Sequence, residues 1–195
     1  MEERGLKLSD EKTVITNIND GFDFLGWNFR KFKEKLLIQP SRKSKQKVTK
    51  SLSRTVKYHH EASQELLIIK LNQITRGWAE YHHSVCAKKT YALIDHRLWE
   101  MLWKWAKRRH PRKGRKWIKN RYWHPKENRE WSFRTDRAIL YQMMDMPIVR
   151  IRSLDLKKNP FLDSDYFERR RKQHKKDKET AYFSSTAALS GYYAL

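Results

Sequence analysis

Two segments of the chain are so densely cationic that any fold must hold their charges at the surface. Residues 30–58 contain eleven Lys or Arg and one acid, and residues 101–126 contain eleven Lys or Arg and no acid. These segments, at +10 and +11, carry nearly all of the formal net charge of +22 on 195 residues. Because clustered like charges repel one another, such a surface is stabilised by a polyanion.

Nucleic acid is the polyanion that this pattern favours. The longest aliphatic run, Leu66–Ile69, is far shorter than the roughly 20 apolar residues of a membrane-spanning helix. Binding to a membrane surface calls for an isolated amphipathic helix with a lipid-facing stripe. The second cationic segment instead alternates with Trp and Tyr and is interrupted by Pro111 and Gly114. Rings among cations suit stacking on bases, so we predict a nucleic-acid partner and no membrane.

The apolar pattern predicts a mainly α fold that begins with a β-hairpin. Apolar residues alternate from Phe22 to Phe29 and resume at 36–38, on either side of a charged turn at 33–35. A helix is expected over 45–59, capped by Ser41 or Ser44, and its narrow apolar seam has a spacing of four. The seam consists of Val48, Leu52 and Val56.

Two further helices complete a predicted three-helix bundle. Ser63 caps a helix that runs to about His82, and the next helix spans about 88–109 with a basic last turn. The apolar face of the first consists of Leu66, Ile69, Leu71, Ile74 and Trp78, and that of the second of Tyr91, Ile94, Leu98, Met101, Leu102 and Trp105.

The rest of the chain is predicted to form a basic loop and a small irregular C-terminal region. The loop follows Pro111, and a second hairpin is expected on either side of a polar turn at 125–130. A helix over 138–144, an extended piece at 148–151 and a turn at 159–160 follow. The uncharged residues 181–195 are expected to be an irregular tail.

No catalytic residue, metal site or cofactor is predicted. The chain has no Asp-Asp pair of the kind that two-metal polymerases use, and Asp20 and Asp163 fit turns or helix starts better. The histidine pairs at 59–60 and 82–83 each point about 100° apart on a helix and cannot share one ion. The single cysteine, Cys86, indicates a reducing intracellular compartment.

Several phrases in order over more than 100 residues resemble the maturases encoded by group II introns. The most specific is Arg-Gly-Trp-Ala-Glu-Tyr at 76–81. The others are Leu-Ser-Asp-Glu-Lys-Thr (8–13), Gly-Phe-Asp-Phe-Leu-Gly (21–26), Gln-Pro-Ser-Arg-Lys-Ser (39–44), Ile-Asp (94–95) and Leu-Trp-Lys-Trp-Ala-Lys-Arg-Arg-His-Pro (102–111).

The resemblance implies a domain organisation. Residues 1–40 would be the end of the reverse-transcriptase palm, and 41–134 the maturase domain X, a thumb-like bundle with its basic loop. Residues 135–180 would be a connector toward a DNA-binding and endonuclease region, and 181–195 the tail. We expect both catalytic modules of the family, the palm carboxylates with their Mg²⁺ and the HNH endonuclease, to be absent.

The function implied is binding of group II intron RNA, or of an RNA/DNA duplex, to promote splicing. Two alternatives stay open: a thumb that serves a split polymerase whose palm is a separate upstream polypeptide, or a degenerate fragment. The compartment would be the bacterial cytoplasm or a eukaryotic organelle. Trp78 and Tyr81 are expected in the core. The predicted RNA contacts are Arg42, Lys43, Lys45, Lys47, Lys50, Arg54, Lys104, Lys107, Arg108, Arg109, Arg112, Lys113, Arg115, Lys116 and Lys119.

Overall fold

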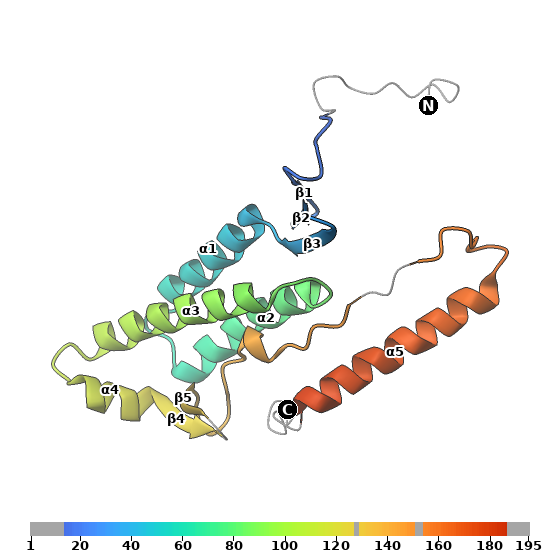
Figure 1. Ribbon diagram of the computed structural model, residues 1–195. Coiled ribbons are helices and arrows are strands. Elements are labelled where there is room, and N and C mark those ends of the chain that lie inside the picture. The colour runs from blue at the N-terminus through green and yellow to red at the C-terminus, as the bar shows by residue number, and fades with distance from the viewer. Residues whose placement is uncertain (1–13, 127–128, 151–153, 187–195) are drawn as a thin grey trace.

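The computed structural model describes residues 14–126, 129–150 and 154–186 (Figure 1). Its described part is mainly helical after an N-terminal sheet, as predicted. The phrase at 8–13, Ile151 and the tail from 187 onward lie outside the described residues. The elements are β1 (Phe22–Phe24), β2 (Trp27–Phe32), β3 (Lys35–Pro40), α1 (Arg42–Tyr58), α2 (Gln64–His82), α3 (Lys88–Arg109), α4 (Arg115–Tyr122), β4 (Trp123–Lys126), β5 (Arg129–Phe133), the 3₁₀ turn η2 (Met143–Asp145) and α5 (Ser164–Thr186).

The N-terminal sheet has three antiparallel strands in the order β1-β2-β3. The hairpin predicted around residues 33–35 is β2–β3, in which Phe32 pairs with Lys35. The alternating run from Phe22 to Phe29 is not one strand, because the chain reverses between Phe24 and Trp27. Leu25 and Gly26 have φ values of 47° and 81°, as a primed two-residue turn requires. The apolar alternation of the sequence continues across this turn, so the pattern alone does not reveal that the chain reverses there.

The three predicted helices pack as a bundle, and both predicted serine caps are present. Ser41 and Ser63 accept hydrogen bonds from the backbone N–H groups of Ser44 (3.1 Å) and Leu66 (3.2 Å). The seam Val48, Leu52 and Val56 is buried against α2 and α3. The buried apolar residues of α2 and α3 are Leu67, Ile68, Leu71, Ala79, Tyr91, Ile94, Leu98, Leu102, Trp105 and Ala106.

The predicted apolar face of α2 is partly wrong. Leu66 and Ile69 are 41% and 47% exposed, whereas Leu67 and Ile68 are fully buried. The aliphatic run 66–69 points in every direction around a helix, so periodicity alone cannot choose the buried side. Packing against the neighbouring helices determines which side of α2 is buried.

The predicted basic loop is shorter than expected, because α4 begins at Arg115. The hairpin predicted after it is confirmed as β4–β5, in which Trp123 pairs with Phe133. The predicted helix at 138–144 is wrong, since only η2 is helical there. The Asn72 side chain bonds the backbone of Ile139 and Tyr141, both at 2.8 Å, and so supports an extended segment.

The C-terminal region is irregular only in part in the described residues, because a long helix, α5, follows the irregular segments before residue 164. The turn at 159–160 is present, with a hydrogen bond from Leu162 N to Asn159 O of 3.2 Å. The helix α5 then continues through the residues expected to begin the tail, as far as Thr186. Lys178 and Tyr182 join it to Glu80 of α2, each at 2.6 Å. Its predominantly polar sequence has no clear apolar stripe, so periodicity did not reveal it. Within the described residues, no helix has the length and apolar character needed to cross a bilayer.

A buried histidine joins the sheet to the bundle. His82 has no exposed surface, and its Nδ1 accepts a hydrogen bond from Trp27 Nε1 of β2 (2.9 Å). Since Nδ1 accepts, Nε2 carries the proton and donates to Ser44 Oγ of α1 (3.1 Å), which also accepts from Trp78 Nε1 (3.2 Å). Burial lowers the pKa of His82 to about 4. A second ring proton would face the indole N–H, so the folded protein favours the neutral ring.

This network predicts loss of stability in acid. Above pH 6.5, His82 is neutral in the folded and the unfolded chain. Between pH 6.5 and about 4, the unfolded chain binds a proton that the folded chain excludes, so the free energy of unfolding falls by up to about 1.4 kcal/mol per pH unit. Urea unfolding from pH 7.5 to 4 should therefore show a shallower pH dependence for His82→Gln than for the natural chain. The exposed-site control His96→Gln should keep the natural slope; parallel curves for all three would contradict the assignment.

Candidate nucleic-acid interface

Four predicted cations of α1 lie on the side of the helix away from its buried seam: Lys43, Lys47, Lys50 and Arg54. Arg42 lies at the flank, and Lys45, three residues before Val48, lies on the seam side. Five of the six are exposed and Lys45 is half-buried. From Arg42 to Arg54 this cationic face extends about 18 Å along the helix, since each residue adds about 1.5 Å. The outward cations, here called the α1 face, are Arg42, Lys43, Lys47, Lys50 and Arg54.

The end of α3 carries cations between two clefts. Lys104, Lys107 and Arg108 are exposed. Residues 103 and 105 point about 200° apart on a helix, so Trp103 and Trp105 face opposite sides. Each faces one of the two clefts.

The cleft on the Trp105 side, here called the α1–α3 cleft, brings the two cationic segments together. It has a volume of about 460 Å³, and the last turn of α1 contributes Lys57 opposite Arg108 of α3. Its lining consists of Val56, Lys57, His60, Glu61, Met101, Trp105, Arg108 and Arg109.

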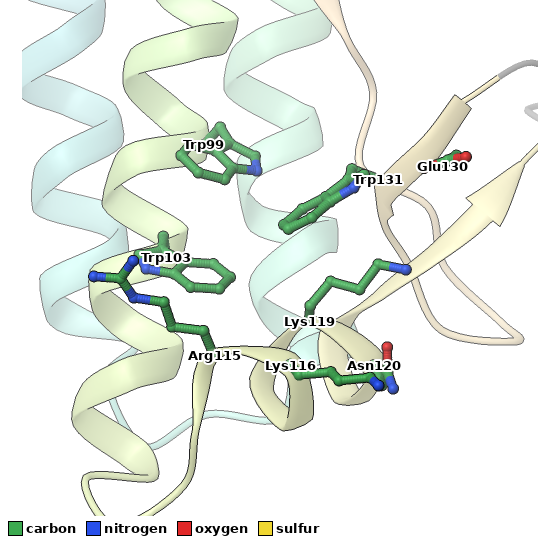
Figure 2. A pocket seen from close by; sticks show the side chains of 8 residues that line it. All are labelled: Trp99, Trp103, Arg115, Lys116, Lys119, Asn120, Glu130 and Trp131. Atoms are coloured by element: carbon green, nitrogen blue, oxygen red, sulfur yellow. The ribbon is translucent and has the colours of Figure 1, made fainter.

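The cleft on the Trp103 side, here called the tryptophan cleft, has a volume of about 570 Å³. Figure 2 shows α3 and β5 presenting indole rings toward it, while α4 supplies cations along one wall. The structure thereby brings three predicted cations together beside aromatic rings. The lining consists of Trp99, Trp103, Arg115, Lys116, Lys119, Asn120, Glu130 and Trp131.

The predicted cations have no acidic partners within the protein. In the described ranges, none of the fifteen forms an ion pair with a carboxylate. Acids that do form ion pairs with Lys or Arg, such as Glu80, Asp145 and Asp163, pair with other residues: Lys178, Arg129 and Lys158. The positive field of this surface therefore acts outward, on whatever binds there.

Arg109 differs from the other predicted contacts because it is engaged within the fold. Its guanidinium lies 4.7 Å from the centre of the Trp105 ring and donates to the carbonyl oxygens of His60 and Ala62. These bonds fasten the end of α3 to the connection between α1 and α2. Arg108, its neighbour, makes no such contact.

The predicted core positions hold for Trp78, which is half-buried against the core, and only in part for Tyr81. Tyr81 is 51% exposed, yet its hydroxyl donates to Leu25 O at 2.6 Å and its ring lies 5.5 Å from that of Trp27. It secures the β1–β2 turn and leaves one side open.

The sequence-based site set omitted the rings of the tryptophan cleft and Asn120. Trp99 and Trp103 are four residues apart, a spacing that places two side chains on one helix face. That signal was available in the sequence. The approach of Trp131 from β5 was not, because it depends on how the β4–β5 hairpin packs.

The histidines and acids do not form a metal centre in the ranges described. No group of three or more His, Cys, Asp or Glu that could hold an ion occurs among them. Asp95 is half-buried, and its carboxylate accepts hydrogen bonds from the backbone N–H groups of Met143 (3.0 Å) and Met144 (2.9 Å). These two bonds hold η2 against α3, and desolvation raises the pKa of Asp95 to about 6.

The geometry defines a helical domain with an uncompensated cationic surface. Residues 42–123 match the family model of the group II intron maturase-specific domain. The match extends from α1 to the first residue of β4 and supports the resemblance found in the motifs of that segment. No curated protein matches the chain.

The contrast between neighbouring arginines gives a stability prediction. Arg109→Ala should lower the free energy of unfolding by about 1 kcal/mol, because it removes bonds to two carbonyl groups and the cation–π contact. Arg108→Ala is the matched control and should change it by less than about 0.5 kcal/mol. Urea unfolding at pH 7.5 measures both. Equal losses in the two variants would show that Arg109 does not fasten α3.

Proposed function

We propose that the chain binds structured group II intron RNA through its cationic surface and thereby promotes splicing. The maturase-specific domain supports an intron maturase-type function. The observation that carries the RNA-binding step is the absence, in the described part of the chain, of any carboxylate paired with the fifteen predicted cations.

The shape of the surface favours recognition of RNA backbone. The α1 face is a helix side bearing several cations and few groups that read base edges. A-form RNA exposes phosphates and 2′-hydroxyls but hides its base edges in a deep major groove, so contacts of this kind depend on shape and charge. Binding then stabilises the folded intron, because a ligand that binds only one state shifts the equilibrium toward it.

Binding should depend steeply on salt, and the cations of the α3–α4 connection and the first turn of α4 should account for part of the slope. Lys113→Ala combined with Lys116→Ala should reduce the slope of log affinity against log salt by up to about 2, since each lost phosphate contact removes roughly one unit. Filter binding of labelled intron RNA between 50 and 300 mM salt, roughly the range over which such slopes are resolved, measures this.

A double variant of equal charge separates this effect from net charge. Lys70→Ala combined with Lys89→Ala removes two exposed lysines from α2 and the start of α3, away from the predicted contacts. It should leave the slope nearly unchanged. A flat salt dependence in the natural chain, or equal losses in both double variants, would overturn the assignment.

A further inference from the structure

The rings of the tryptophan cleft are arranged as an open stacking surface. Trp99 and Trp103 of α3 are nearly parallel, with centroids 5.7 Å apart and planes at 15°. The ring centroid of Trp131 of β5 lies 6.3 Å from that of Trp99 and 6.2 Å from that of Trp103. Its plane is inclined to theirs by 56° and 42°, respectively. Beneath them Trp123 packs 5.2 Å from Trp103. One indole thus supports the group from below, and three line the cleft.

Filling the core does not explain all of these rings. Trp123 is 1% exposed and Trp105 is 4% exposed, as core residues are. Trp131, in contrast, is 43% exposed, and Trp99 and Trp103 are half-buried. Leaving large apolar faces in contact with water is unfavourable, by roughly 25 cal/mol for each Å² that could be buried. A partner that covers these faces would recover that free energy.

The side chains of α4 make one wall of the cleft positively charged, which favours an anionic partner. Arg115, Lys116 and Lys119 line the cleft, and Lys119 Nζ lies 5.6 Å from the centre of the Trp131 ring. None of the three has an acidic partner in the part of the chain that is described. Glu130 is the one acid in the lining, and Figure 2 shows it beyond Trp131, on the side away from Trp103.

The dimensions suit a single nucleotide. A cleft of about 570 Å³ falls within the range of pockets that hold small molecules. A base inserted between two parallel rings needs a separation of about 7 Å, twice the roughly 3.5 Å contact distance between carbon atoms. The rings of Trp131 and Trp103 are closer, at 6.2 Å, and inclined, so a base can stack on one ring but not between them. Asn120 adds an amide that can donate to and accept from a base edge.

We propose that the tryptophan cleft binds one unpaired nucleotide of the RNA, with its base stacked on Trp131 and its phosphate held by Arg115, Lys116 and Lys119. This inference rests on the proposed function and adds a single-strand site to it. A duplex cannot use the rings, because its bases are already stacked on one another, whereas an unpaired base is free to stack on an indole. The cleft therefore distinguishes a bulge, a loop or a strand end from a continuous helix.

The test compares two exposed tryptophans. Trp131→Leu removes the proposed stacking ring, and Trp117→Leu is the matched control, because Trp117 is 40% exposed but lines no part of this cleft. The probes are a single-stranded oligoadenylate of four nucleotides and a blunt RNA duplex without unpaired residues. Affinity is measured by the fluorescence anisotropy of end-labelled RNA, with the melting temperature of each variant as a check on folding.

Trp131→Leu should weaken binding of the oligoadenylate roughly tenfold and leave duplex binding within about twofold, as the loss of one stacked base predicts. Trp131→Phe keeps a ring and should restore most of the affinity, while Trp117→Leu should match the natural chain. The proposal is overturned if oligoadenylate binding survives in Trp131→Leu, or if oligoadenylate and duplex binding fall equally. If the natural chain binds the duplex in a salt-dependent way but Trp131→Leu does not change oligoadenylate binding, this site alone is rejected. If the natural chain binds no RNA at all, the proposed function is rejected.

Discussion

The neutral, buried ring of His82 determines how the two parts of the N-terminal half fit together. It accepts from Trp27 of the sheet and donates to Ser44 of α1, whose hydroxyl also accepts from Trp78 of α2. Removing any of these partners would leave a buried polar atom unpaired, which costs more than an ordinary hydrogen bond contributes. The junction also sets the position of α1, because the Ser44 side chain at its start is bonded to His82 and Trp78 of α2.

A chain with this much charge needs strong packing elsewhere, and its aromatic residues supply it. Tyr122, Trp105 and Phe133 lie within 6.2 Å of one another, between the end of α3 and the β4–β5 hairpin. This packing holds α4 against α3 although the connecting segment is strongly cationic. The same cluster ends in the half-exposed rings of the tryptophan cleft. Stability and binding thus use adjoining parts of one aromatic group.

Much of the bundle could be predicted from the sequence, because local signals there agree with packing. The serine caps and the regular spacing of Val48, Leu52 and Val56 identify helices whatever surrounds them. The predictions were wrong where contacts between residues far apart in the sequence determine the local structure. The side chain of Asn72 keeps residues 139–141 extended, and the pair Lys178–Glu80 holds a helix that has no clear apolar stripe.

The candidate site divides in the same way. Its cations could be identified from composition and their exposure was expected, but composition could not separate Arg109, which fastens α3, from Arg108, which is exposed and has no such contact. Nor could it place Trp131 beside Trp103, because the two residues come from different elements. Spacing along one helix can be read from a sequence, whereas packing between a helix and a hairpin requires the fold.

Splicing of intron RNA in the presence of the purified full chain tests the central claim most directly. Precursor RNAs, each carrying one group II intron from the source genome, would be incubated at a magnesium concentration at which the intron alone splices slowly. The account predicts that the chain raises the yield of ligated exons for at least one intron, and that raising the salt concentration abolishes the gain. No increase for any intron, with the protein folded throughout, would contradict it.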